Sequence, residues 1–412
     1  MRYGLLGEKL GHSFSKEIHE KLGRYRYELI EVPPEKLDAF MRERAFDGLN
    51  VTIPYKQAVI PYLDALSERA RAIGAVNTIV NREGRLCGDN TDFAGLEALI
   101  GRMGLSLRGR TVLICGTGGT SKTAAAVAEA LHAGEIVRLS RGAKDGAITY
   151  EEAYEKYAGA EILINTTPRG MFPDVTGVSV DLGRFPGLQG VVDVIYNPLT
   201  TRLVREARTQ KIPAENGLYM LVAQAVGAAA VFLDEQFGAE TVERVYREIL
   251  FEKRNLVLTG MPGSGKSTIG TLLAARLGRE LADTDAEIVK RAGTPITEIF
   301  RTKGEAAFRN LESEVIRELS LTGDGKIIAT GGGAVLRREN VEALKMNGAL
   351  VFLDRRVEDL IPTDDRPLSD DAEKMRALYQ TRYPIYTKTA DLTLPVRGTP
   401  EDTVNKLLEM LK

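Results

Sequence analysis

The sequence predicts an α/β protein. Its 412 residues are too many for one hydrophobic core, so we expect two or three domains. Short apolar runs alternate with helical patterns over residues 2–92. A strand, a glycine turn and a helix follow one another over residues 111–133, and the same order returns over residues 255–277. This alternation is typical of layers in which helices cover a largely parallel sheet.

Composition narrows the class of protein. Hydrophobic residues make up 43% of the chain and charged residues 27%, which is typical of a globular protein. The net charge of −2 provides no electrostatic attraction to nucleic acid or to an anionic membrane, so we expect neither as a partner. Cys87 and Cys115 are too few for a disulfide framework, and no apolar run is long enough for a membrane span. Without a secretory segment after Met1, we expect a cytoplasmic protein.

In the first region, residues 2–92, we expect strands at residues 3–6, 27–32 and 49–53. Polar residues follow these strands, where an open α/β sheet binds its ligands. They form three groups: His12, Ser13 and Ser15; Asn50, Thr52 and Lys56; and residues 88–92 (Gly-Asp-Asn-Thr-Asp). Each group also has a structural interpretation. Ser15 and Asp92 can cap the helices that follow them, and Lys56 can be a solvated lysine.

The second region has the pattern of a dinucleotide-binding unit. The strand 111–115 runs into the turn Gly116-Thr-Gly-Gly119 and an alanine-rich helix at 121–133, with Ser121 at the third small position of G-x-G-x-x-G. After the next strand, 136–139, an NAD-binding unit carries an acid that holds the ribose, whereas this chain has Ser140 and Arg141. Arg141 suits a 2′-phosphate, so NADP is favoured, with a plain surface arginine as the alternative.

A buried helix is expected further on. Strands are predicted at 161–165 and 190–195, and residues 218–233 then form an almost wholly apolar helix. Gln224 interrupts it, and a buried amide of this kind usually has a hydrogen-bond partner. A helical stripe continues to Lys253, where a short linker without a Gly/Ser-rich run leads into the last region.

The stretch GMPGSGKS, residues 260–267, predicts a phosphate-binding loop between the strand 255–259 and a helix. Backbone N–H groups turn inward around phosphate oxygens, Lys266 adds a positive charge, and Ser267 can reach Mg2+. Asp283, near the end of a strand expected at 281–285, can hold the same ion through its water shell. The alternative is a chance glycine-rich turn. Arg309, Arg366 and Arg382 are candidates for binding carboxylate or phosphate, unless they are ordinary surface residues.

These motifs resemble two families. Residues 1–250 resemble shikimate dehydrogenase through Gly11-His-Ser-Phe-Ser15, Asn50-Val-Thr-Ile-Pro-Tyr-Lys56, Gly74-Ala-Val-Asn77, residues 88–92 and residues 216–224. Residues 254–412 resemble shikimate kinase. The resemblance implies a substrate domain made of residues 1–93 and 216–252, a Rossmann NADP-binding domain at 94–215 and a P-loop nucleoside-monophosphate-kinase-like domain at 254–412.

For the first half, the resemblance assigns a catalytic dyad of Lys56 and Asp92. It implies substrate contacts from Ser13, Ser15, Thr52, Asn77, Tyr196 and Gln224. It implies NADP contacts from Gly116, Gly118, Gly119, Ser140, Arg141 and Gly217. The chemistry agrees, because a lysine ammonium oriented by an aspartate can protonate the alkoxide formed when hydride reaches a carbonyl.

For the second half, the resemblance places shikimate on Asp285, Arg309, Gly332 and Arg382, with Asp285 as a catalytic residue. It places ATP on Gly263, Ser264, Gly265, Lys266, Ser267, Thr268 and Arg366, and Mg2+ on Ser267 and Asp283. The segment 353–366 departs from the family, because it is short and has Pro362, Asp364 and Asp365 where a second basic residue often precedes the Arg-Pro pair.

The sequence therefore predicts a bifunctional enzyme that reduces 3-dehydroshikimate with NADPH and phosphorylates the shikimate with ATP and Mg2+, two steps toward aromatic amino acids. One alternative is a quinate/shikimate dehydrogenase that uses NAD and is fused to a small-molecule kinase. Another is that one half is an inactive binding module. The oligomeric state stays open, and a homo-oligomer is compatible with the sequence.

Overall fold

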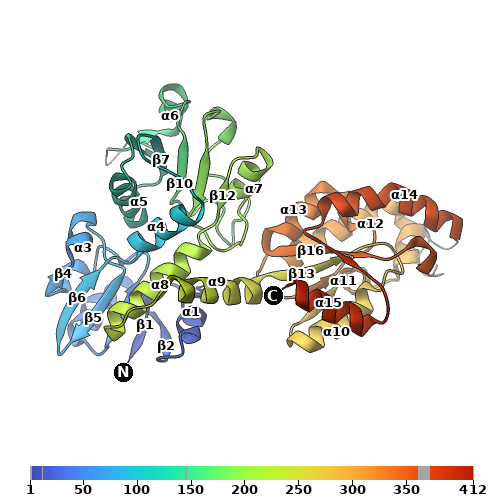
Figure 1. Ribbon diagram of the computed structural model, residues 1–412, viewed down its shortest axis with the longest axis horizontal. Coiled ribbons are helices and arrows are strands. Elements are labelled where there is room, and N and C mark those ends of the chain that lie inside the picture. The colour runs from blue at the N-terminus through green and yellow to red at the C-terminus, as the bar shows by residue number, and fades with distance from the viewer. Residues whose placement is uncertain (1, 12, 144–145, 361–371, 412) are drawn as a thin grey trace. The chain divides into compact units, whose positions relative to one another are not determined.

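The computed structural model describes residues 2–11, 13–143, 146–360 and 372–411 (Figure 1). The chain divides into two compact units, Met1–Tyr196 with Thr201–Leu250, and Asn197–Thr200 with Phe251–Lys412. The described residues form two six-stranded sheets in the first unit and one five-stranded sheet in the second. The predicted α/β class is confirmed.

The first sheet is mixed and has the order β2-β1-β3-β5-β6-β4. Its strands are β1 (Tyr3–Gly7), β2 (Tyr27–Glu31), β3 (Gly48–Val51), β4 (Ala65–Leu66), β5 (Thr78–Arg82) and β6 (Arg85–Asp89). Its helices are α1 (Ser15–Lys21), α2 (Leu37–Glu43) and α3 (Glu68–Ile73). β1 runs parallel to β2 and β3, and β5 and β6 pair antiparallel. Strand β3 ends at Val51, two residues before the predicted end, so Thr52 lies just beyond the strand.

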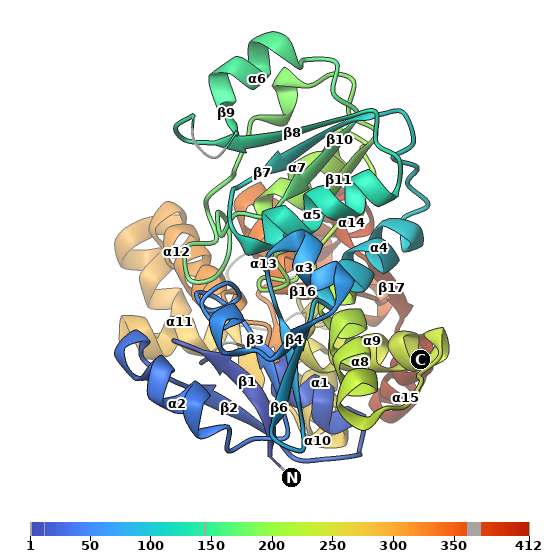
Figure 2. The same ribbon diagram turned by 90° about the vertical axis from the view of Figure 1, so that its left-hand side faces the viewer.

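The second sheet is wholly parallel and has the order β12-β11-β10-β7-β8-β9. Its strands are β7 (Thr111–Cys115), β8 (Glu135–Ser140), β9 (Ile148–Thr149), β10 (Ile162–Asn165), β11 (Gly190–Asp193) and β12 (Ala214–Glu215). Its helices are α4 (Asp92–Arg102), α5 (Gly119–Ala130), α6 (Tyr150–Lys156) and α7 (Arg202–Thr209). Figure 2 shows α5 in front of this sheet. The strand order reverses between β7 and β10, which is where an open parallel sheet binds its ligand.

Helix α8 (Leu218–Leu233) follows the second sheet in the chain but packs against α1, α4 and β5. Its crossing with α4 requires Gly95, because a Cβ atom there would lie 2.7 Å from the Met220 carbonyl oxygen. The side-chain carbonyl of Gln224 on this helix accepts a hydrogen bond from Asn77, the residue before β5. Helix α9 (Ala239–Lys253) continues from there to the second unit.

The third sheet is parallel and has the order β14-β15-β13-β16-β17. Its strands are β13 (Asn255–Thr259), β14 (Leu281–Asp283), β15 (Ile327–Ala329), β16 (Gly348–Asp354) and β17 (Leu392–Pro395). Its helices are α10 (Lys266–Leu277), α11 (Thr284–Ala292), α12 (Ile296–Ser320), α13 (Arg338–Asn347), α14 (Ala372–Thr389) and α15 (Pro400–Met410). Non-helical backbone at Gly304, with φ of +80°, breaks α12 into two pieces.

The expected strand 281–285 is two residues too long. The Asp283 carboxylate accepts hydrogen bonds from the backbone N–H groups of Asp285 and Ala286, so it caps α11. Asp285 consequently lies in the first turn of that helix. A helix N-terminus, where the dipole favours negative charge, thus carries the predicted catalytic aspartate.

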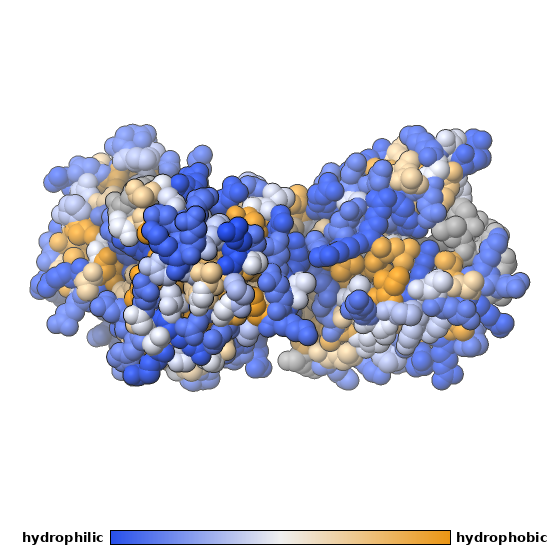
Figure 3. All heavy atoms as spheres, turned by 90° about the horizontal axis from the view of Figure 1, so that it is seen from above, coloured by the Kyte–Doolittle hydropathy of each residue, from blue (hydrophilic) through white to orange (hydrophobic). Residues whose placement is uncertain are grey.

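Hydrophilic residues predominate on the face in Figure 3, and hydrophobic residues form small patches between them. Among the described residues, no helix is long and apolar enough to cross a membrane.

Candidate active sites

Lys56 and Asp92 form an ion pair in the first unit. The Lys56 ammonium donates to the Asp92 carboxylate at 2.6 Å, and the two side chains are only 15% and 9% exposed. The alternatives of a solvated lysine and a helix cap are therefore wrong, since Thr91 precedes α4 and no side chain caps this helix. The loop after β3 and the first turn of α4 bring together an acid and a base 36 residues apart in the chain.

A buried amide network borders this pair. Asn77 donates to Thr91 at 3.0 Å and to the Gln224 carbonyl at 3.3 Å, while its own carbonyl accepts from the Thr91 backbone at 2.7 Å. Gln224 in turn donates to the Leu221 carbonyl at 2.8 Å. The amides that the sequence predicted as substrate contacts are thus held in fixed orientations. Sequence reasoning missed Thr91, although it lies within the motif 88–92.

The predicted serine contacts lie around α1. Ser13 donates to the Ser15 hydroxyl at 3.1 Å and accepts from the Ser15 backbone, and no side chain caps α1, so the capping interpretation of Ser15 is wrong. Burial raises the pKa of Tyr196, and a hydrogen bond with Ser13 lowers it in part. The Phe14 and Tyr196 rings are 5.1 Å apart. Ser13, Ser15 and Tyr196 therefore gather at one place.

The glycine turn after β7 lies beside Lys56. A methyl group on Gly119 would be 3.7 Å from the Lys56 Cβ and Cδ atoms. Gly116 needs glycine, because its φ is +115° and a Cβ atom would lie 2.7 Å from Thr166 Oγ1. Ser121 closes the turn by donating to the Gly116 carbonyl at 2.6 Å, which explains a serine at that position. A dinucleotide on this turn would lie next to the ion pair.

The remaining predicted NADP residues occupy different surroundings. Ser140 ends β8 and donates to the Gly142 carbonyl at 2.8 Å, and Arg141 follows it in an exposed position. Gly118 precedes α5, and no atom would crowd a Cβ there. Gly217 precedes α8 and packs so closely that a Cβ atom would lie 2.0 Å from the Val194 carbonyl oxygen. Gly217 is thus required for packing whatever else it contacts.

In the second unit, residues 260–265 form a loop between β13 and α10, and Lys266 and Ser267 begin the helix. Lys266 points into this loop and donates to the Gly260 and Met261 carbonyls at 2.9 and 2.8 Å. Ser264 is buried, Gly263 and Gly265 have positive φ values of 75° and 94°, and Thr268 lies exposed in the first turn of α10. This geometry suits phosphate binding by backbone N–H groups.

Ser267 and Asp283 meet at the rim of the loop. The Ser267 hydroxyl donates to Asp283 Oδ2 at 2.7 Å, while Asp283 Oδ1 caps α11. A hydroxyl and a carboxylate oxygen side by side are hard oxygen donors of the kind that Mg2+ prefers beside nucleotide phosphates. The residues therefore fit the predicted ion.

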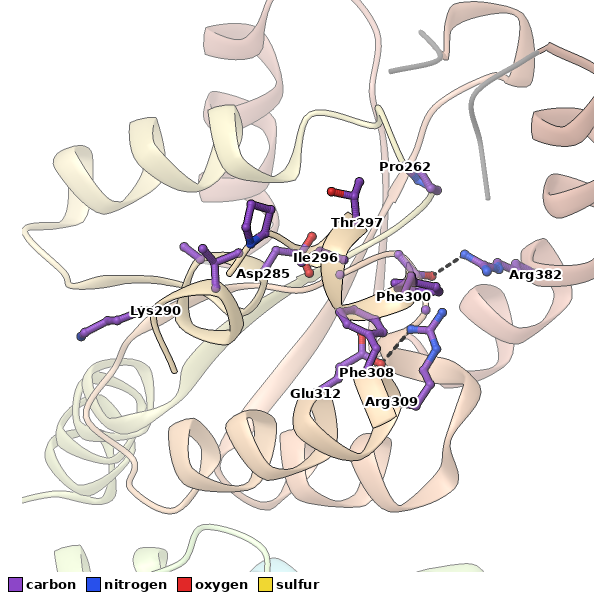
Figure 4. A pocket seen from close by; sticks show the side chains of 16 residues that line it. Pro262, Asp285, Lys290, Ile296, Thr297, Phe300, Phe308, Arg309, Glu312 and Arg382 are labelled. Carbon is purple, nitrogen blue, oxygen red and sulfur yellow. Dashed lines mark hydrogen bonds and ion pairs between the residues drawn. The ribbon is translucent and has the colours of Figure 1, made fainter. Parts of the chain in front are cut away.

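A cavity of about 580 Å³ opens beside this loop. Figure 4 shows Asp285, Arg309 and Arg382 reaching it from α11, α12 and α14. Arg382 donates to the Gly332 carbonyl at 3.2 Å, so two of the predicted shikimate contacts touch each other. The apolar wall includes Phe300 and Phe308, whose ring centroids are 4.8 Å apart. These two rings were not predicted from the sequence.

Glu312 is a further lining residue that sequence reasoning missed. It is fully buried and accepts from Arg309 Nη1 at 2.8 Å, while Oε1 has no hydrogen-bond partner among the described residues. Burial raises the pKa of Glu312, and the Arg309 guanidinium opposes this rise. Its position three residues after Arg309, on the same helical face, was the available sequence signal. Arg309 is thereby held facing the cavity.

Five positions that the sequence analysis named cannot be placed. Arg366, expected over the phosphates, lies outside the described residues, as do Pro362, Asp364 and Asp365. His12 is also outside them.

Comparison with known families identifies both units. Residues 5–79 match the family model described as shikimate dehydrogenase substrate binding domain, and residues 262–412 match that of shikimate kinase. A Clostridium perfringens shikimate dehydrogenase (NADP(+)) is 35% identical over 268 residues, covering 60% of this chain and 97% of the relative.

Solved structures support the assignment of the dehydrogenase part of the chain. The Thermus thermophilus shikimate 5-dehydrogenase in complex with NADP(H) and shikimate is 32% identical to this chain, with a TM-score of 0.54. The match covers 60% of this chain and 99% of that one. A Corynebacterium glutamicum quinate dehydrogenase in complex with NAD is 27% identical, with a TM-score of 0.54, covering 61% of this chain and 98% of that one. The chain therefore belongs to the shikimate dehydrogenase family, carries a shikimate kinase domain after it, and is an enzyme with both activities.

Proposed function

We propose that the chain carries out two consecutive reactions, NADPH-dependent reduction of 3-dehydroshikimate to shikimate and ATP-dependent phosphorylation of shikimate to shikimate 3-phosphate. The observation that carries this proposal is the Lys56–Asp92 pair beside the glycine turn of the Rossmann sheet. Reduction is the proposed direction because the second unit of the same chain consumes shikimate.

In the first reaction, bound NADPH supplies the hydride that reaches the carbonyl carbon. Lys56 donates a proton to the oxygen, and Asp92 orients the ammonium through its hydrogen bond. Ser13, Ser15, Thr52, Asn77, Tyr196 and Gln224 hold the ring and its carboxylate. Arg141, exposed at the end of β8, binds the 2′-phosphate that distinguishes NADP from NAD, with Gly116, Gly118, Gly119, Ser140 and Gly217 around the rest of the cofactor.

In the second reaction, Arg309 and Arg382 grip the shikimate carboxylate in the cavity, and Gly332 lies against the ring. Asp285 accepts from a ring hydroxyl and orients it toward the terminal phosphate. Residues 263–268 hold the phosphates of ATP, together with Arg366. Ser267 and Asp283 hold Mg2+, which neutralises charge on the phosphates when bound.

The test uses the full chain and two matched variants. The wild type should oxidise NADPH with 3-dehydroshikimate and release ADP once ATP and Mg2+ are added. Lys56→Met should strongly lower the first activity alone, and Lys266→Met the second activity alone. If shikimate supplied directly produces no ADP, the proposed kinase reaction is wrong. A preference for NADH with quinate would instead favour the alternative dehydrogenase.

A further inference from the structure

The end of strand β16 packs against the phosphate loop at two points. A Cβ atom on Gly260 would lie 3.0 Å from the Leu353 carbonyl oxygen. Two residues further along, Arg355 reaches the other end of the loop, where a methyl group on Gly265 would be 3.9 Å from its Nη1 atom. The Arg355 guanidinium therefore lies beside the first turn of α10, where the loop's N–H groups converge.

Arg355 has no polar partner among the described residues. It is partly buried, yet its side chain makes no hydrogen bond or ion pair within the part of the chain that the structure describes. Other arginines near this sheet are satisfied: Arg397 donates to the Asp354 carbonyl at 3.1 Å, and Arg279 to the Phe251 carbonyl at 2.6 Å. A partly desolvated guanidinium without an anion is unfavourable unless a ligand supplies the negative charge.

The sequence between Arg356 and Arg366 supplies no further cation for a phosphate. Residues 357–365 include Glu358, Asp359, Asp364 and Asp365 and no lysine or arginine. A triphosphate bound on the loop can accept a further cationic donor besides Lys266, Arg366 and Mg2+, and an arginine binds phosphate through two donors at once.

We propose that Arg355 is a nucleotide-binding residue that donates to the phosphate chain of ATP from the β16 side of the loop. This rests on the proposed position of the ATP phosphates on residues 263–268. Arg355 would act together with Lys266, whose ammonium donates to the Gly260 and Met261 carbonyls within the loop.

The chain offers a matched control one residue away. Arg356 has the same charge and nearly the same place in the sequence, but it is exposed and leads into a short 3-10 turn (Val357–Asp359). Both substitutions remove one positive charge from the domain, so a general electrostatic effect would be the same in both. Only a direct contact between Arg355 and the nucleotide would make the two variants differ in nucleotide affinity.

The experiment measures ADP binding by calorimetry and kinase kinetics on the full chain. Arg355→Met should raise the Kd for ADP and the KM for ATP roughly 10- to 100-fold, as for loss of a charge-assisted hydrogen bond, and should weaken inhibition by tripolyphosphate. Arg356→Met should change both constants less than about twofold. Arg355→Lys should restore part of the affinity, because the charge remains but the second donor is lost. The KM for shikimate and the dehydrogenase turnover should not change.

Three results would overturn the inference. One is an Arg355→Met variant that binds ADP like Arg356→Met. Another is weaker adenosine binding with normal tripolyphosphate inhibition, which would place the guanidinium on the base. The third is equal loss of affinity for ADP and shikimate, which would mean a structural role. Lys266→Met separates this inference from the function on which it rests: if that variant binds ADP normally, the loop itself is wrongly assigned.

Discussion

Replacing Lys56 by methionine removes the proposed proton donor while keeping an unbranched side chain of similar length. A positioned general acid contributes a factor of about 10² to 10⁴, so the dehydrogenase kcat should fall by that factor, or about 2.7 to 5.4 kcal/mol in activation free energy. The kinase, in the other compact unit, should keep its turnover and provides an internal control for folding.

The same substitution has a calculable effect on stability. Asp92 loses its partner at 2.6 Å while its side chain stays 9% exposed. Stranding one member of a fully buried pair costs about 3 to 5 kcal/mol, and residual solvent contact here lowers the expected cost to about 1 to 3 kcal/mol. The double variant Lys56→Met with Asp92→Asn no longer buries a lone charge, so it should recover most of this stability without recovering activity.

The assay measures the rate of NADPH oxidation and the urea unfolding of four proteins. They are the wild type, Lys56→Met, Asp92→Asn and the double variant. Stability restored without activity would separate the chemical role from the structural one. The reasoning is refuted if Lys56→Met keeps more than a tenth of the wild-type kcat. It is equally refuted if dehydrogenase and kinase activities fall together, which indicates misfolding.

Three further predictions concern other residues. Arg141→Asp should move the NADPH to NADH ratio of kcat/KM toward NADH by at least about tenfold, because it removes a phosphate donor and adds a ribose acceptor; an unchanged ratio would make Arg141 a plain surface residue. Arg309→Ala should raise the KM for shikimate far more than that for ATP, since an unpaired buried carboxylate costs about 2 to 5 kcal/mol; equal KM values in variant and wild type would exclude the carboxylate contact. Burial lowers the pKa of His19 to about 3, so the folded state excludes a proton that the unfolded chain binds below about pH 6.5. Its stabilising contribution is complete above that pH and is lost as pH falls toward 3, by about 2 kcal/mol at pH 5; His19→Gln should show a flatter urea midpoint between pH 7 and 5, and an equally steep decline would contradict the assignment.

Elements with a strong local pattern could be predicted from the sequence alone. Strands β7 and β13 and helix α8 have the predicted bounds, because an apolar run of strand length and an apolar helix are both complete within their own segments. The glycine turn at Gly116 was also predictable, since a φ of +115° leaves few alternatives to glycine. Candidate residues such as Lys56 and Asp92 could be named, but from their types alone a solvated lysine and a helix cap were equally good interpretations.

Only the tertiary structure decided between those interpretations. It placed Lys56 against Asp92 and Gln224 against Asn77, pairs that are 36 and 147 residues apart in the chain. Gln224 reaches Asn77 because α8 packs against α4 and β5. It moved Asp285 from a strand into a helix, since the Asp283 cap competes with strand geometry at that point. It also revealed Glu312 as a buried partner of Arg309 and Arg355 as a partly buried cation beside the loop. Burial and the lack of a partner depend on all the elements that surround a side chain, and no local stretch of sequence contains them.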